Sequence, residues 1–350
     1  MTHRIATIVG ARPQFIKAAA LSRALLAEPA LSEDLIHTGQ HFDDNMSEIF
    51  FRELAIPTPR FNLDIHGGHH GQMTGHMLEA IEAVLLDTRP ALVLVYGDTN
   101  STLAGALAAA KLHIPVAHVE AGLRSFNRRM PEEINRVLVD HLSALLFCPT
   151  FDAISNLQRE GIIQGVHHTG DVMFDATLYA RHAALGQSDI LERCALTPGQ
   201  YVLSTIHRSE NTDDETRLRA ILEHLRRAAV GKPIVLPLHP RTRQVLARFG
   251  IDTAGLRLLE PVGYFDMHRL LGSAAMVLTD SGGVQKEAYF HRVPCVTLRD
   301  DTEWTETLAA GWNRLWTQAD YVTPRVDIPE YGDGDAGAKM VVLLKDFLEH

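Results

Sequence analysis

Apolar runs of strand length alternate with segments of helical spacing along almost the whole chain. In the first half, the apolar runs are Ile5–Val9, Leu35–His37, Ala91–Tyr96, Pro115–Val119, Leu145–Cys148 and Gly165–His168. In the second half, they are Tyr201–Ile206, Ile234–Leu238, Leu256–Leu259, Met276–Leu278 and Cys295–Leu298. The segments between the runs carry apolar residues at helical spacing and begin at turn residues. This alternation predicts an α/β protein with parallel sheets that helices cover on both faces.

A polar segment at 184–200, which contains glycine, serine and proline, separates the two halves and is predicted to be a linker. We therefore expect an N-terminal Rossmann-like domain at 1–183 and a C-terminal one at 184–335. The amphipathic segment at 336–350 is expected to form a terminal helix that joins the first domain. A further helix is expected from Asp44 to Leu54. Two doubly wound domains facing across a deep cleft would bind ligands at the carboxyl ends of their strands.

The amino-acid composition limits which kinds of molecule the protein is expected to bind. Hydrophobic residues make up 46% and charged residues 22% of the 350 residues, as in ordinary globular proteins. The net charge of −10 argues against nucleic acid as a partner, because a phosphate backbone requires a basic face. No apolar run approaches the roughly 20 residues that span a bilayer. The three cysteines are scattered and no signal peptide precedes the first strand, so we expect a cytoplasmic protein.

The turn that follows the Met276–Leu278 run is typical of an anion site. Ser281, Gly282 and Gly283 connect this predicted strand to a predicted helix, whose N-terminus offers free N–H groups and a positive dipole end. The glycines allow the backbone to approach a ligand closely. Glu287 lies one turn further along the same helix and is placed to hold ribose hydroxyls. An ordinary helix-capping turn has the same pattern, so this signal is weak by itself.

Chargeable residues follow many of the other predicted strands. They are Arg12, Lys17, Asp98, Glu120, Arg124, His207, Arg208, Glu210 and His239. Their distribution over both halves predicts one site for an anionic ligand. Asp98, Glu120 and Glu132 could form a carboxylate cluster, whose mutual repulsion would raise at least one pKa toward the range useful for acid–base catalysis. The alternative is that Asp98 caps the next helix and that Glu132 only favours a helix N-terminus.

A histidine-rich loop contains His66, His69 and His70. It lacks a nearby cysteine and the helical i, i+4 spacing of zinc-binding histidines. We therefore predict no metal site there.

Several motifs, spread in order along the chain, resemble one family. They are Gly10–Lys17 (GARPQFIK), Gly97–Thr99 (GDT), His118–Arg124 (HVEAGLR), Pro131–Arg136 (PEEINR), His207–Asn211 (HRSEN), Thr279–Glu287 (TDSGGVQKE) and Tyr331–Gly334 (YGDG). The pattern is similar to that of the non-hydrolysing UDP-N-acetylglucosamine 2-epimerases. The resemblance implies the two-domain GT-B fold, an isomerase without metal or redox cofactor, and a homodimer. It also implies inversion of C2 in a UDP-HexNAc by elimination and re-addition of UDP through a 2-acetamidoglucal.

The resemblance also implies roles for individual residues. The catalytic candidates are Asp98, Glu120, Glu132 and His207. The candidates for substrate or UDP binding are Arg12, Lys17, Arg124, Arg136, Arg208, His239, Ser281, Gly282, Gly283 and Glu287. The candidates for a second, allosteric UDP-sugar site are Gln40, His41, Gln72 and Glu210.

Departures from the family pattern bear on the substrate. Many members have Thr-Glu-Arg-Pro-Glu where this chain has Thr302-Glu303-Trp304-Thr305-Glu306, so Trp304 replaces an arginine. Thr302-Glu303-Trp304, together with Gly170–Asp175 (GDVMFD) and Gly311–Leu315 (GWNRL), resembles the branch that acts on UDP-2,3-diacetamido-2,3-dideoxyglucuronate to supply surface polysaccharides. Asp43 replaces a family glutamine near the allosteric site, which argues against activation by UDP-GlcNAc. The alternative functions are a GT-B glycosyltransferase with a UDP-sugar donor and a sugar-nucleotide-binding regulator without catalysis.

Overall fold

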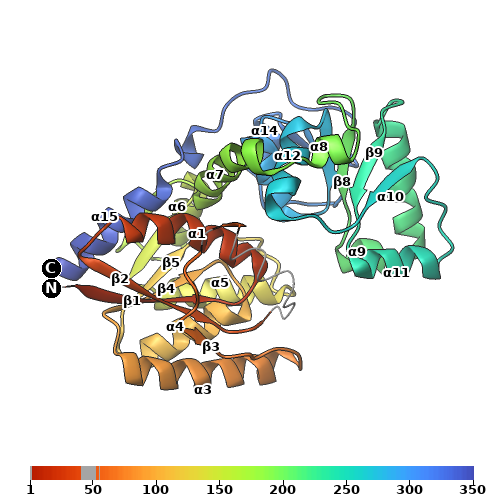
Figure 1. The fold of residues 1–350 in the computed structure, drawn as a ribbon. Helices are drawn as coiled ribbons and strands as arrows, with labels where there is room; N and C mark the ends of the chain where they lie inside the picture. The colour runs from red at the N-terminus through yellow and green to blue at the C-terminus, as the bar shows by residue number, and fades with distance from the viewer. Residues whose placement is uncertain (1, 41–52, 55) are drawn as a thin grey trace. The chain divides into compact units, whose positions relative to one another are not determined.

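In the computed structural model, which describes residues 2–40, 53–54 and 56–350, the chain forms two compact units. Unit 1 comprises Met1–Ala176 and Pro329–His350, and unit 2 comprises Thr177–Ile328. Figure 1 shows the elements of both units. The first boundary falls inside helix α7 (Val172–Gln187) instead of after residue 183. The second falls before Pro329, ahead of the terminal helix expected from 336.

The prediction of a linker at 184–200 is wrong. Helix α7 extends to Gln187, and a short helix α8 (Ile190–Arg193) follows it. Ile190, Leu191 and Leu196 are buried in the core of unit 2. The glycine, serine and proline residues of this segment form turns next to these buried apolar side chains. The composition therefore resembles that of a linker, although the segment is packed.

Unit 1 contains a seven-stranded parallel sheet with the order β3-β2-β1-β4-β5-β6-β7. Its strands are β1 (His3–Val9), β2 (Leu31–His37), β3 (Phe61–Asn62), β4 (Leu92–Tyr96), β5 (Val116–Val119), β6 (Leu145–Cys148) and β7 (Val166–His168). Every residue of the central strand β4 is buried, as its continuous apolar sequence predicts. Because β4 and β5 pair in register with Tyr96 opposite Val119, the residues that follow them are neighbours at one edge of the sheet.

Helices cover both faces of this sheet. They are α1 (Arg12–Leu26), α3 (His70–Thr88), α4 (Asn100–Lys111), α5 (Pro131–Leu142), α6 (Phe151–Arg159) and α15 (Ala336–Glu349), with a 3-10 turn η1 (Pro329–Tyr331). Figure 1 shows α1 and α15 on one face and α3 and α4 on the other. The first turn of α15 is anchored by Asp175, which accepts the N–H groups of Ala336 at 3.2 Å and Gly337 at 2.8 Å. The C-terminal helix therefore completes unit 1.

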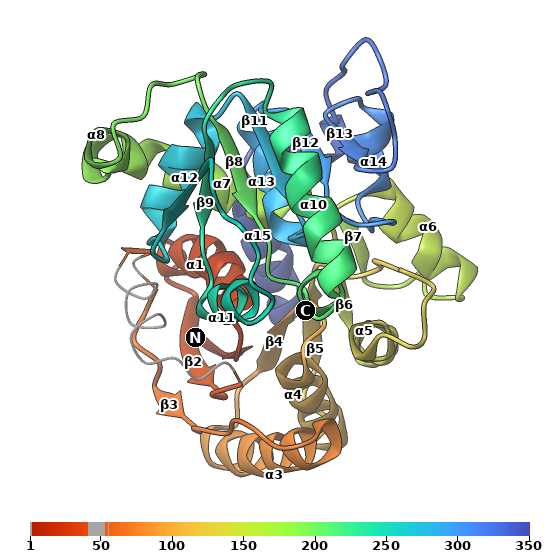
Figure 2. The ribbon, with the colours of Figure 1, turned by 90° about the vertical axis from the view of Figure 1, so that its right-hand side faces the viewer.

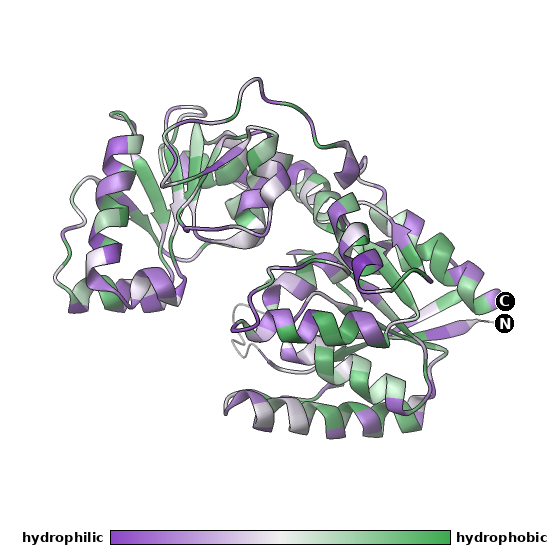
Figure 3. Cartoon of the chain, turned by 180° about the vertical axis from the view of Figure 1, so that it is seen from behind, coloured by the Kyte–Doolittle hydropathy of each residue, from purple (hydrophilic) through white to green (hydrophobic). Residues whose placement is uncertain are grey.

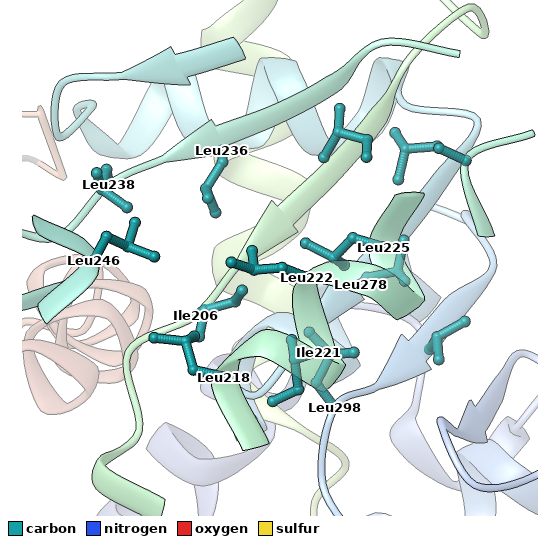
Figure 4. Close-up of a cluster of buried hydrophobic side chains, with 14 of the residues drawn as sticks. Ile206, Leu218, Ile221, Leu222, Leu225, Leu236, Leu238, Leu246, Leu278 and Leu298 are labelled. Carbon is teal, nitrogen blue, oxygen red and sulfur yellow. The ribbon is translucent and has the colours of Figure 1, made fainter. Parts of the chain in front are cut away.

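Unit 2 contains a six-stranded parallel sheet with the order β10-β9-β8-β11-β12-β13, part of which faces the viewer in Figure 2. Its strands are β8 (Val202–Thr205), β9 (Ile234–Pro237), β10 (Leu256–Leu259), β11 (Met276–Thr279), β12 (Cys295–Thr297) and β13 (Asn313–Leu315). Its remaining helices are α9 (Ser209–Thr212), α10 (Glu215–Ala228), α11 (Pro240–Arg248), α12 (Tyr264–Ser273), α13 (Gly282–Phe290) and α14 (Thr305–Ala309). Figure 4 shows the apolar face of α10, with Leu218, Ile221 and Leu222, packed on this sheet.

The strands predicted from apolar runs all occur, and their observed bounds differ from the prediction at some of the ends. Strands β3 and β13 were not predicted. Figure 3 shows that the strands are largely apolar, with polar residues in some of them, whereas helices carry one apolar and one polar side. The helix expected from Asp44 lies largely outside the described residues. Within the part of the chain that the structure describes, no helix is long and apolar enough to cross a bilayer.

Candidate active site

Two of the predicted catalytic carboxylates stand side by side at the carboxyl edge of the first sheet. Asp98 follows β4 after Gly97, and Glu120 directly follows β5. Glu120 has a φ of 71°, in the left-handed region that residues other than glycine rarely adopt. Such conformations cost on the order of 1 kcal/mol and concentrate at functional sites. The strand end therefore holds the Glu120 carboxylate in a position that an extended backbone would not give.

Each of these carboxylates has its own cationic partner. Lys17 of α1 forms an ion pair with Glu120, and Arg136 of α5 forms one with Asp98. The four side chains are mostly buried, although Asp98 keeps 31% of its side-chain surface exposed. Lys17 and Arg136 were predicted as substrate-binding residues. The structure places both in contact with the catalytic candidates.

The pKa of Asp98 is raised, as expected for one carboxylate of the cluster, but for a different main reason. Burial has the largest effect, and the nearby Glu120 carboxylate adds a smaller one. The charges of Arg136 and Lys17 act in the opposite direction and lower the pKa. Mutual repulsion is therefore a secondary cause, and desolvation of the charged form is the primary one. A carboxyl group tuned in this way is suited to proton transfer.

The two glutamates at the start of α5 differ in environment. Glu132 is exposed, which leaves its carboxylate accessible from solvent. Glu133 is buried and accepts the backbone N–H groups of Ser125 at 2.8 Å and Phe126 at 2.9 Å. Glu133 also lies 3.2 Å from Arg136, so it braces the guanidinium that meets Asp98. This support by Glu133 was not identified from the sequence, where the two glutamates are equivalent.

Arg124 lies in a buried network beneath β5. Its guanidinium is 2.7 Å from both Asp140 and Glu160, and only 1% of its side-chain surface is exposed. Asp140 also meets His118 at 2.7 Å, and these partners lower the pKa of Asp140 although its burial alone would raise it. In this structure Arg124 therefore helps to fix the end of β5, and its contact with substrate stays a prediction.

In unit 2, His207 is held at the end of β8 by a buried carboxylate. His207 Nδ1 is 3.0 Å from Asp280 Oδ1, while 47% of the His207 side-chain surface stays exposed. Asp280 also accepts the backbone N–H groups of His207 and Arg208, each at 3.0 Å, and the amide of Asn211 at 3.0 Å. Asp280 is thus the residue that orients His207. It was quoted in a motif but not predicted as part of the site.

The predicted phosphate turn has the expected form. Ser281 is the N-cap of α13, and its hydroxyl accepts the N–H of Val284 at 3.4 Å. A Cβ on Gly283 would have Ser281 Oγ as its nearest neighbour, at 4.0 Å, whereas one on Gly282 would lie 2.5 Å from Glu303 Oε1. Glu287 is buried further along α13, with His268 Nε2 3.8 Å from its carboxylate. The turn is therefore a helix N-terminus of the kind that binds anions, with the Glu303 side chain beside Gly282.

The other predicted binding and allosteric residues lie at several places. Arg12 is the exposed first residue of α1, and Arg208 is half-buried beside Asp280. His239 is the exposed N-cap of α11 and accepts the N–H of Arg241 at 3.3 Å.

Among the allosteric candidates, Gln40 accepts the N–H of Ser101 at 3.0 Å, and Gln72 is exposed on α3. Glu210 lies 3.8 Å from Arg299. His41 and Asp43 lie outside the described residues. Among the residues that are described, no group of three or more histidine, cysteine, aspartate or glutamate side chains is arranged to hold a metal ion.

Comparison with known proteins identifies the family. The family model described as UDP-N-acetylglucosamine 2-epimerase matches residues 23–345. The UDP-2,3-diacetamido-2,3-dideoxy-D-glucuronate 2-epimerase of Pseudomonas aeruginosa is 55% identical over 89% of this chain and 88% of its own length. The solved Methanocaldococcus jannaschii UDP-GlcNAc 2-epimerase in complex with UDP-GlcNAc and UDP is 41% identical, with a TM-score of 0.85 over 99% of this chain and all of that one.

A more distant relative has the same fold. The Neisseria meningitidis UDP-GlcNAc 2-epimerase bound to UDP-GlcNAc is 28% identical, with a TM-score of 0.87 over 98% of this chain and 100% of that one. The expected class of two Rossmann-like units of the GT-B type is confirmed by these matches and by the two parallel sheets. The chain belongs to the UDP-N-acetylglucosamine 2-epimerase family.

Proposed function

We propose that this chain inverts C2 of UDP-2,3-diacetamido-2,3-dideoxyglucuronate to give the corresponding mannuronate, with UDP-N-acetylglucosamine as the second candidate substrate. The 55% identity to the Pseudomonas aeruginosa relative of that name supports the first substrate. Trp304, which replaces the arginine of many family members, points the same way. The observation that carries the proposal is the pair of carboxylates Asp98 and Glu120, each ion-paired at the end of adjacent strands.

The chemistry requires a good leaving group, because the C2 proton is not next to a carbonyl. In the elimination, the C2–H bond breaks and its proton passes to a carboxylate. The C1–O bond breaks with its electron pair on UDP, and C1 and C2 become doubly bonded. In the return step, C2 receives a proton on the opposite face and a UDP oxygen re-forms the bond to C1. The C2 configuration is inverted and no net oxidation takes place.

We assign the proton transfers to the carboxylates of unit 1. Asp98 and Glu120 are the paired candidates, and the exposed Glu132 is the third. Arg136 forms an ion pair with Asp98 and Lys17 forms one with Glu120, and these contacts orient the two carboxylates. His207, held by Asp280, assists at the reacting centre or the departing diphosphate.

We assign the UDP to unit 2, where the N-terminus of α13 offers N–H groups to the diphosphate and Glu287 is placed for the ribose. Arg12 and Arg208 supply further positive charge. Stabilisation of the departing diphosphate by fixed donors is the kind of effect that contributes most to such reactions.

The test is solvent isotope exchange. Purified protein is incubated with each sugar nucleotide in deuterated water, and C2 is followed by NMR. We expect deuterium at C2 and the manno product. Asp98→Asn and Glu120→Gln should lower turnover by at least 10²-fold while leaving UDP affinity within a few-fold. Asp152→Asn, at an exposed carboxylate on α6, is the matched control and should keep full activity. Absence of exchange with both sugars would reject the proposal.

A GT-B glycosyltransferase is the alternative enzyme. It would release UDP only when an acceptor is present and would not exchange the C2 proton. The two carboxylates with dedicated cations favour the epimerase, because a transferase has no need of a pair of bases in one unit.

We further propose that the enzyme works in the cytoplasm as a homodimer and without a metal or redox cofactor. Cys148, Cys194 and Cys295 are free thiols, which suits a reducing compartment. Size-exclusion chromatography with light scattering should give twice the chain mass. Treatment with EDTA should leave turnover unchanged.

A further inference from the structure

Trp304 has a buried polar atom without a partner. Only 5% of the residue is exposed, and among the described residues its Nε1 has no hydrogen-bond partner. The other two tryptophans differ, since Trp312 Nε1 donates to the Val326 carbonyl at 2.9 Å and Trp316 Nε1 donates to Asp300 at 3.0 Å. A buried donor without an acceptor costs about 1–3 kcal/mol. The Trp304 N–H is therefore the one indole donor that the described part of unit 2 leaves available for a ligand.

This N–H lies at the N-terminus of α13. A Cβ placed on Gly282, the first residue of this nine-residue helix, would be 3.5 Å from Trp304 Nε1. The positive end of the helix dipole and the indole N–H therefore occupy the same place. Both features favour a negatively charged acceptor, and they come from different elements of the unit.

A cation lies over the face of the indole ring. Lys286 Nζ lies 3.8 Å from the centroid of the Trp304 ring, and Lys286 is 1% exposed. An ammonium over an aromatic face is attracted to it, and more strongly where water is excluded. It also withdraws electron density from the ring, which makes the N–H a better donor to an anion. The nearby Glu303 carboxylate is paired with Arg299 at 2.8 Å, which offsets part of its negative charge.

We propose that Trp304 is a substrate-binding residue whose indole N–H donates a hydrogen bond to an anionic oxygen of the sugar nucleotide at the N-terminus of α13. This inference rests on the proposed function, because the ligand is the UDP-sugar assigned there. The oxygen belongs either to the diphosphate or to the C6 carboxylate of a uronate sugar. Lys286 then supplies, through the ring, the positive charge that an arginine at position 304 would supply directly.

The experiment compares Trp304→Phe with Trp316→Phe. Phenylalanine at 304 keeps an aromatic face for Lys286 but removes the N–H, whereas Trp316→Phe removes an N–H that is bonded within the protein. Calorimetric titrations use UDP, UDP-N-acetylglucosamine and UDP-2,3-diacetamido-2,3-dideoxyglucuronate. We expect Trp304→Phe to weaken binding roughly tenfold without lowering the melting temperature. Trp316→Phe should leave all three affinities unchanged.

The pattern of loss separates the two acceptors. Weaker binding of all three ligands assigns the N–H to the diphosphate, and loss confined to the uronate nucleotide assigns it to the C6 carboxylate. Unchanged affinity for all three in Trp304→Phe would overturn the inference while leaving the proposed function intact. If the unmodified protein bound none of the three, the proposed function itself would fail.

A second measurement does not depend on the folding of Trp304→Phe. Protein labelled with ¹⁵N-tryptophan should show one indole signal for each of its three tryptophans, and Trp312→Phe and Trp316→Phe identify the signal of Trp304 by elimination. Addition of the bound nucleotide should move the Trp304 proton downfield, as expected for a new hydrogen bond to an anion. A Trp304 signal that stays in place at saturation would contradict the proposal.

Discussion

Asp280, directly after β11, contacts the ring of His207, with 3.0 Å between Asp280 Oδ1 and His207 Nδ1. Asp280 is fully buried, and burial alone would raise its pKa. The hydrogen bond and charge of His207, the backbone N–H of Arg208 and the side-chain amide of Asn211 lower the pKa instead. The carboxylate is therefore ionised at neutral pH, and it fixes both the backbone and the ring of His207. When a buried carboxylate orients a histidine, one ring nitrogen is hydrogen-bonded to the carboxylate and the other points away from it.

Asp280→Asn should lower both turnover and stability. The substitution removes the charge that meets the imidazole, so we expect kcat to fall 10- to 100-fold and the free energy of unfolding to fall by about 2–4 kcal/mol. If Asp280 acts on catalysis through His207, the double variant with His207→Ala should be no slower than His207→Ala alone. The double-mutant cycle compares kcat and urea unfolding of the wild type, the two single variants and the double variant. If the loss of kcat in the double variant equalled the product of the two single losses, a positioning role for Asp280 would be contradicted.

Glu120 has a second property besides its charge, its left-handed backbone. Glu120→Gln and Glu120→Gly both remove the carboxylate, and both should be inactive. Glycine adopts a φ of 71° without strain, so Glu120→Gly should be more stable than Glu120→Gln by about 1 kcal/mol. Urea unfolding measures the difference.

Arg89 supplies the control for this comparison. It is exposed, has a φ of 46° at the end of α3, and lies in none of the contacts assigned to the site. Arg89→Gly and Arg89→Gln should show the same order of stability as the Glu120 variants, with turnover unchanged. Equal stability of the two Glu120 variants would show that the strand end relaxes and stores no strain.

The sheets could be predicted because their strands are short, apolar runs between clear turns. Leu92–Tyr96 is the plainest case. Strand β3 was missed because Phe61–Asn62 is only two residues long. Strand β13 has the sequence Asn-Arg-Leu, and its Asn313 is held by Thr297 through a side-chain hydrogen bond of 3.0 Å. Such a strand depends on a partner that is known only after folding.

The site was predictable to the extent that strand ends converge. Asp98 and Glu120 were placed by this rule. Their pairing with Arg136 and Lys17 was not, because it joins residues 38 and 103 positions apart. The buried Asp280 and the unpartnered N–H of Trp304 are likewise products of tertiary packing. Sequence patterns show which residues can carry a charge, whereas only the tertiary contacts show which of these residues hold a catalytic side chain in place.

Arg136 makes the activity dependent on pH in a predictable direction. Burial raises the pKa of Asp98, and the charge of Arg136 lowers it. Arg136→Met should therefore raise the pKa of Asp98 further, so the carboxylate becomes protonated at higher pH. We expect the acid limb of the profile of kcat/KM against pH to move to higher pH. The control is Arg129→Met, at an exposed position before α5, which should leave the acid limb in place. If the acid limb of Arg136→Met did not move, the titration that controls activity would not be that of Asp98.

Asp175 should make the stability of unit 1 decrease as pH rises. It caps α15, and burial raises its pKa from 3.8 to about 6 despite the N–H groups it accepts. A raised carboxyl pKa contributes stability that is fully present below the unfolded pKa and is lost as pH rises through about 6. Asp175→Asn keeps an oxygen acceptor without the charge, so relative to wild type it should gain up to about 2–3 kcal/mol between pH 4 and pH 7. Urea unfolding at both pH values measures this gain, with Asp152→Asn as the exposed control. A difference between Asp175→Asn and wild type that does not change with pH would show that the folded protein does not shift the titration of Asp175.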